Sequence, residues 1–146
     1  TGLPPRPRYD ARPPGLAGMT QAIPSLSVVI PCLNERDRLP LLLADLHQGR
    51  GDLELVIADG GSIDGSPAIA RLSGAQVITV EPAGRGRQLA KGARHASGSW
   101  LLFLHADSRL PKTWAEHIRT VLLSPQAAAY ISRLRRFRHL RYTGPF

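Results

Sequence analysis

The chain has 146 residues, a formal net charge of +8 at pH 7 and a hydrophobic fraction of 42%. That length suits one domain with its own core, and the longest apolar run, at residues 100–104, is far too short to span a bilayer. A single cysteine, Cys32, excludes an internal disulfide and fits a reducing cytoplasm.

The positive charge lies mostly at the two ends of the chain. Residues 1–24 hold three arginines and one aspartate, and residues 124–146 hold five arginines and no acidic residue. Residues 25–123 hold eleven lysines and arginines against ten acidic residues and are nearly neutral. This distribution argues against a nucleic-acid-binding domain, although the C-terminal arginines leave open a binder of nucleic acid or anionic membranes.

Sequence pattern divides the chain into three parts. Residues 1–24 are rich in proline and glycine and predict a disordered tail. Residues 25–123 alternate short apolar runs with helical spacings and are expected to form the folded domain. Residues 124–146 lose that pattern and form a basic segment.

Strands and helices are expected to alternate through the folded domain. The strands are predicted at residues 26–30, 53–58, 76–80 and 100–104, and the helices at 39–46, 66–72, 86–96 and 111–122. We expect Pro31 to end the first strand, Ser66 to cap the second helix, and Leu72 and Val121 to face the core. The alternation predicts βαβ units and a Rossmann-like α/β fold with a mostly parallel sheet, which binds ligands at the carboxyl ends of its strands.

Polar loops follow the predicted strands at that edge. They contain Asn34-Glu35, Asp59-Gly60-Gly61-Ser62, Gly84-Arg85-Gly86-Arg87 and His105-Ala106-Asp107. Asp59 could accept a hydrogen bond from a base or ribose, but Asp-Gly-Gly-Ser is equally good turn chemistry. Asn34 and Glu35 either contact the nucleoside or cap the first helix. Cys32 has no partner for nucleophilic chemistry and is expected to pack in the core.

Two of these loops suit phosphate chemistry. Arg85 and Arg87 stand where a helix begins, and free N–H groups with arginines attract phosphate, although a flexible basic loop explains the pattern as well. Asp107 could hold a divalent cation that bridges two phosphates. His105 is a softer ligand, better matched to Mn2+ than to Mg2+, or it only orients Asp107.

In their order and spacing, the loops resemble glycosyltransferase family 2. The resemblance covers roughly residues 26–123, and it is nearest to small bacterial enzymes with DGGS and LHAD signatures. It is carried by Ser27-Val28-Val29-Ile30-Pro31, Asn34-Glu35, Asp59-Gly60-Gly61-Ser62 with Asp64-Gly65, Gly84-Arg85-Gly86 and His105-Ala106-Asp107. The resemblance implies the nucleotide-sugar-binding half of a GT-A fold, a nucleoside-diphosphate sugar donor and a divalent metal, Mn2+ or Mg2+.

The resemblance also implies roles for individual residues. Asp59 matches the carboxylate that reads the nucleobase, and its loop adds Gly61 and Ser62 to the nucleotide-sugar site. The loop that lines the nucleoside corresponds to Pro31, Asn34 and Glu35. The region beside the base and diphosphate corresponds to Arg85 and Arg87. Asp107 matches the last acid of the family's Asp-x-Asp metal motif, and His105 stands where the first acid is usual.

The acceptor half of such an enzyme is not recognisable in this sequence. After Asp107 the only acid is Glu116, which is expected to be solvated rather than to serve as the catalytic base. We therefore expect a truncated chain that binds the donor and transfers little sugar, with a nucleotide-binding fragment without turnover as the alternative. By family analogy the acceptor is a lipid or isoprenoid, such as a carotenoid acid or polyprenyl, and the protein is cytoplasmic and peripheral on the inner face of the cell membrane.

Overall fold

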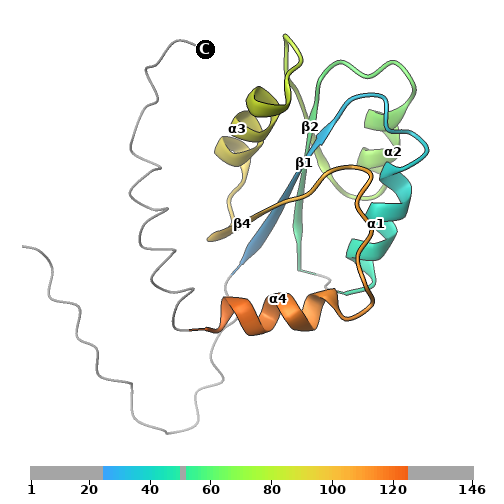
Figure 1. Cartoon of the computed structure of the whole chain (residues 1–146). Coiled ribbons are helices and arrows are strands. Elements are labelled where there is room, and N and C mark those ends of the chain that lie inside the picture. The colour runs from blue at the N-terminus through green and yellow to red at the C-terminus, as the bar shows by residue number, and fades with distance from the viewer. Residues whose placement is uncertain (1–24, 50–51, 125–146) are drawn as a thin grey trace, which may run out of the picture.

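The computed structural model describes residues 25–49 and 52–124, and these residues form a parallel sheet with helices on both faces (Figure 1). Within this part of the chain the strands are β1 (Leu26–Cys32), β2 (Glu54–Asp59), β3 (Gln76–Thr79) and β4 (Trp100–Phe103). The helices are α1 (Leu39–His47), α2 (Ser66–Leu72), α3 (Arg85–His95) and α4 (Trp114–Leu122). The strand order is β3-β2-β1-β4 and every pair is parallel, so the predicted α/β alternation is confirmed. The terminal segments 1–24 and 125–146 lie outside the described residues.

The two central strands are buried on both faces, which explains their continuous apolar sequences. Alternate residues of a strand point to opposite sides of the sheet. Val28 and Ile30 lie in the core that α1, α2 and Trp114 cover, whereas Val29 and Val56 lie in a smaller core on the other face. Helix α3 packs against β1 and β2 on that second face (Figure 1).

Strand β1 continues through Pro31 to Cys32, so the prediction that Pro31 ends the strand is wrong. The carbonyl of Val29 accepts a hydrogen bond from the N–H of Leu104, and strand alternation directs the nitrogen of Pro31 to the same side. Strand β4 pairs with β1 only as far as Phe103 opposite Val29. The missing N–H of Pro31 therefore lies beyond the last β4 pair, where it removes no ladder bond.

Two predicted details of α2 are also wrong. Gly65 rather than Ser66 precedes the helix, and the carboxylate of Asp64 accepts the N–H of Ser66 at 3.0 Å. Leu72 is 90% exposed instead of facing the core. The buried residues of α2 are Ser66 and Ala70, four positions apart, and Leu72 lies two residues further along the helix, on another face.

Helix α4 starts later than its sequence pattern suggests. Pro111 belongs to a preceding turn, in which the N–H of Trp114 donates to the Pro111 carbonyl at 2.9 Å. Trp114 and Leu122 are buried and Ile118 is partly buried. Val121 is 53% exposed, because it lies off the stripe through Trp114, Ile118 and Leu122.

Candidate functional site

A pocket of about 500 Å³ opens at the carboxyl ends of β1 and β4. These strands are neighbours, and the chain winds away from β1 toward β3 before β4 adds on the opposite side. Parallel sheets bind ligands at such a reversal, and the volume lies in the usual range for small-molecule sites. The pocket is lined by Pro31, Cys32, Leu33, Glu35, Arg38, Ala83, Gly84, Arg85, Gln88, His105, Ala106 and Asp107.

The pocket brings together half of the predicted site residues. Those that line it are Pro31, Glu35, Arg85, His105 and Asp107. Those that do not line it are Asn34, Asp59, Gly61, Ser62 and Arg87. The first group comes from the end of β1 and from the segments after β1, β3 and β4, whereas the loop after β2 contributes no lining residue.

The start of α3 forms one wall of the pocket. Gly84 precedes the helix, and Arg85 is its first residue and is exposed. The first N–H groups of a helix have no intrahelical acceptor, and the aligned peptide dipoles make this end positive. The first turn of α3 contains no acidic residue that would neutralise this positive end of the helix. This wall therefore suits an anionic ligand such as phosphate.

His105 and Asp107 form a second wall of the pocket. Both are exposed, and they flank Ala106, which is buried at 3% exposure in the core beside α1. Strand β4 ends at Phe103, and the N–H of Ser108 donates to the His105 carbonyl at 3.0 Å, so the two residues lie in a turn rather than on a strand. They nevertheless line the same pocket, because burial of Ala106 leaves its two neighbours on the outside.

The donor set of this pair fits a cation that arrives with a diphosphate. In residues 25–49 and 52–124, no three His, Cys, Asp or Glu side chains gather into a metal-binding group. A cation bridging two phosphates takes only one or two protein ligands, since phosphate oxygens and water complete its shell. Asp107 offers a hard oxygen and His105 a softer nitrogen, a combination that suits Mn2+ better than Mg2+.

Asp59 is turned into its own loop. It is 3% exposed, and its Oδ2 accepts the N–H groups of Gly61 and Ser62, both at 2.9 Å. Its Oδ1 accepts the hydroxyl of Ser62 at 2.6 Å. An ionised carboxylate has about four acceptor positions, so about one remains for a ligand. The base-reading role of Asp59 stays a prediction, and these bonds give the residue a structural role as well.

Three of the hydrogen bonds between the loops after β1 and β2 form a set that we call the loop clamp. The backbone N–H groups of residues 34, 35 and 36 donate in turn to Ser62 Oγ at 2.8 Å, Ser66 Oγ at 3.0 Å and Asp64 Oδ2 at 2.9 Å. A hydrogen bond from the Ser66 hydroxyl lowers the pKa of Asp64, which keeps it an ionised acceptor. The loop after β2 therefore holds the loop after β1 in place. Because Glu35 belongs to the loop after β1, the clamp also fixes this part of the pocket lining.

Gln88 is a pocket residue that the sequence reasoning missed. It is 4% exposed, and its Nε2 donates to the carbonyls of Cys32 at 2.9 Å and Ala58 at 2.8 Å. Its Oε1 accepts the N–H of Gly84 at 3.3 Å. One signal could have found it, because Gln88 and Gly92 are four residues apart and form the buried face of α3.

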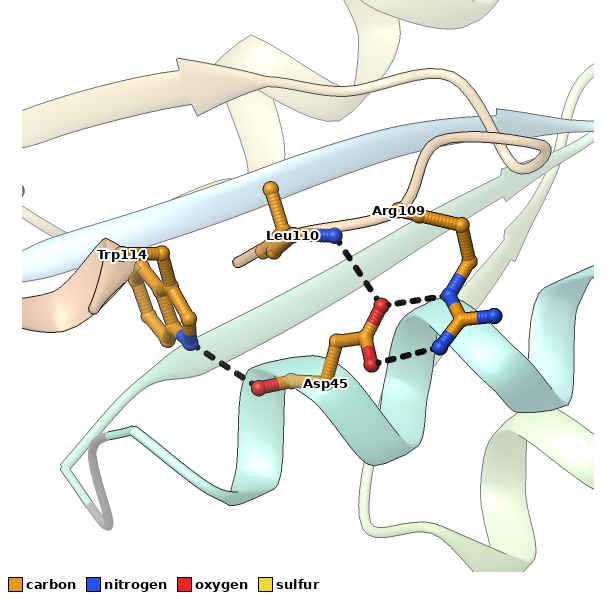
Figure 2. A network of polar contacts seen from close by, with 4 residues as sticks. All are labelled: Asp45, Arg109, Leu110 and Trp114. Carbon is orange, nitrogen blue, oxygen red and sulfur yellow. Dashed lines mark hydrogen bonds and ion pairs between the residues drawn. The ribbon is translucent and has the colours of Figure 1, made fainter. Parts of the chain in front are cut away.

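Asp45 on α1 anchors the segment that follows His105 and Asp107 (Figure 2). Its carboxylate accepts two hydrogen bonds from Arg109, at 2.7 and 3.1 Å, and the N–H of Leu110 at 3.0 Å. Its backbone carbonyl accepts the indole N–H of Trp114 at 2.9 Å. The bonds from Arg109 hold the pKa of Asp45 below its ordinary value. This network fixes the end of the loop that holds His105 and Asp107 to α1.

Replacing Asp45 by asparagine is expected to destabilise the fold at pH 7 but less so in acid. A depressed folded-state pKa contributes stability above the unfolded-state value of about 3.9, and that contribution is lost as pH falls through the folded-state pKa. Urea unfolding of both proteins between pH 7 and pH 3 should show the deficit of the variant shrinking as the pH falls. A deficit of constant size would show that ionised Asp45 contributes no stability.

The sequence comparison matches most of the chain. The family described as Glycosyl transferase family 2 matches residues 27–144. A PGL/p-HBAD biosynthesis glycosyltransferase of Mycobacterium tuberculosis is 38% identical over 96 residues, 61% of this chain and 38% of that protein. A 4,4'-diaponeurosporenoate glycosyltransferase of Staphylococcus haemolyticus is 37% identical over 93 residues, 59% of this chain and 25% of that protein. The chain spans less than half the length of these curated relatives.

Solved structures share the fold. A mannosyltransferase from Pyrobaculum calidifontis, in complex with GDP-Man and Mn2+, matches 79% of this chain and 37% of its own with a TM-score of 0.63 and 24% identity. Glucosyl-3-phosphoglycerate synthase from M. tuberculosis, in complex with Mn2+, UDP and glucosyl-3-phosphoglycerate, matches 70% and 41% with a TM-score of 0.58 and 23% identity. The predicted GT-A fold is thereby confirmed.

Proposed function

Since the chain belongs to glycosyl transferase family 2, we propose that it binds the nucleoside-diphosphate sugar donor of an inverting glycosyltransferase. One observation carries the proposal: the positive start of α3 and the pair His105 and Asp107 line the same pocket. A diphosphate with its cation needs both of these features. The two similar solved structures, which are complexes with UDP or GDP-Man and with Mn2+, support this class of donor.

The pocket residues would favour departure of the nucleoside diphosphate. Negative charge builds on the diphosphate as its bond to the sugar breaks, and donors already in place stabilise that charge. Arg85 and the first N–H groups of α3 supply such donors from one wall. Asp107 and His105 would hold the divalent cation, which supplies further positive charge when bound. Glu35 and Pro31 line the side that we assign to the nucleoside.

We propose that the sugar goes to a lipid or isoprenoid acceptor at the inner face of the cell membrane. The names of the diaponeurosporenoate glycosyltransferase and of the PGL/p-HBAD biosynthesis glycosyltransferase support an acceptor of this kind. The acceptor hydroxyl must lose a proton to a general base, a role that we assign to no residue of the described ranges. Across residues 25–49 and 52–124, no helix has the length and apolarity to cross a membrane.

Thermal unfolding with nucleotides tests donor binding. We expect UDP or GDP with Mn2+ to raise the melting temperature by several degrees, since a ligand at about 100 times its Kd adds about 2.7 kcal/mol. Uridine and guanosine, which lack the diphosphate, serve as controls and should give much smaller shifts. Mn2+ alone should have little effect, because the pair lacks a full ligand set. If neither UDP nor GDP shifted the melting temperature, the proposed function would be wrong.

A further inference from the structure

We propose that Gln88 is a positioning residue for the donor diphosphate: it fixes the first turn of α3 against the carboxyl ends of β1 and β2. The inference rests on the proposed function, because it concerns the same pocket. Gln88 connects three main-chain groups from three elements of the fold, namely the carbonyls of Cys32 and Ala58 and the N–H of Gly84. The turn that it holds is the one that presents Arg85 to the pocket.

The bonding pattern matches a glutamine amide in one orientation. Both amide hydrogens of Gln88 meet carbonyl oxygens, and its own oxygen meets an N–H group. Turning the amide over would set its oxygen against two carbonyl oxygens and its NH2 group against an N–H. A carboxylate of the same shape has no hydrogen to donate, and a methionine of similar size offers no strong donor or acceptor. Because Cys32 and Ala58 are 1% and 0% exposed, their carbonyls would then have little access to water as a replacement donor.

Close packing around Gln88 leaves α3 little freedom to move. An added Cβ on Gly60 would lie 3.0 Å from the Cβ of Ala83 and 3.3 Å from Nε2 of Gln88. One turn further along α3, an added Cβ on Gly92 would lie 2.4 Å from Val29. Successive turns of α3 are therefore held to the sheet, first by the hydrogen bonds of Gln88 and then by the close approach of Gly92.

This arrangement sets the spacing between the two walls of the pocket. Arg85 moves with the first turn of α3, whereas His105 and Asp107 follow β4 and are tied to α1 through Arg109. A diphosphate must reach both walls at once, so a shift of the turn weakens its binding even if every contacting group remains. Loss of Gln88 should thus lower donor affinity beyond any loss of stability.

Isothermal titration of UDP with Mn2+ into the whole chain tests this role, with Gln88→Met as the main variant. We expect Gln88→Met to weaken UDP binding by at least about tenfold, measured well below its melting temperature. Glu54→Gln is the matched control, since Glu54 accepts the N–H and hydroxyl of Ser97 at 2.8 and 3.0 Å at the opposite end of the sheet. The control should lower the melting temperature while keeping the UDP affinity of the parent chain.

Each outcome has a separate meaning. If the parent chain binds UDP or GDP and Gln88→Met binds it equally well, Gln88 has only a structural role and the inference is wrong. If Gln88→Met weakens binding no more than Glu54→Gln does, the inference is likewise overturned. If Gln88→Met does not fold, Gly60→Ala takes its place, because the added methyl presses on Gln88 and Ala83, and unchanged affinity there would also overturn it. If the parent chain binds no nucleotide, the proposed function fails instead.

Discussion

Gly92→Ala is expected to destabilise the chain by about 1–2 kcal/mol, although alanine normally stabilises a helix interior by about 1 kcal/mol over glycine. The added Cβ would lie 2.4 Å from Cγ1 of Val29 and 3.6 Å from the Cβ of Ala58. Both neighbours are fully buried on the central strands and cannot give way. Overpacking of this kind costs about 1–3 kcal/mol, so it outweighs the helix preference.

Gly86→Ala is the matched control for this prediction. Gly86 belongs to the same helix, but its added Cβ would meet no atom within 4 Å apart from its chain neighbours and the adjacent helix backbone. We expect this variant to match or exceed the parent chain by up to about 1 kcal/mol in urea unfolding. Equal stability of the two alanine variants would contradict the close packing of α3 on β1.

Asp107→Ala is expected to abolish the part of the nucleotide-induced rise in melting temperature that depends on Mn2+. The pocket places only His105 beside Asp107 as a further ligand on that wall, and one imidazole holds a hard cation poorly. The shift that UDP or GDP produces in the presence of EDTA should remain, because it arises from Arg85 and the start of α3. Thermal unfolding with the nucleotide, with and without Mn2+, separates the two parts.

Glu116→Ala controls for the loss of one negative charge. Glu116 is exposed on α4 and does not line the pocket, so its removal should leave the manganese-dependent shift intact. A full manganese-dependent shift in Asp107→Ala would refute the assignment of this residue as the metal ligand.

The architecture was largely predictable from local sequence pattern, because buried parallel strands require continuous apolar runs. The errors came from neighbours in space that no local pattern records. Pro31 stays in β1 because β4 stops pairing at Val29, and that depends on where a distant strand ends. Leu72 has the right residue type and the wrong position on α2, whose buried face is defined by the small residues Ser66 and Ala70.

The site was predictable in part, for a different physical reason. Strand-end loops converge in any parallel sheet, so Arg85 and Asp107 could be placed together from their order alone. The spacing of Gln88 and Gly92 indicates a buried face of α3, but the bonding partners of Gln88 could not be predicted, because its acceptors are main-chain carbonyls 56 and 30 residues away and main-chain groups carry no sequence signal. The sequence of the Asp59 loop likewise does not reveal that the Asp59 carboxylate accepts a hydrogen bond from Ser62 of the same loop.

The loop clamp has a consequence for exchanging parts between related enzymes. Three consecutive N–H groups at residues 34–36 depend on side chains of Ser62, Ser66 and Asp64. A chimera that imports a foreign loop after β2 without these acceptors would leave three N–H groups without their protein partners. Water can replace the acceptors at the exposed residues 34 and 36, whereas an unmet N–H at the partly buried Glu35 costs about 1–3 kcal/mol. The loops after β1 and β2 therefore depend on each other, and a redesign of donor preference should exchange both loops together.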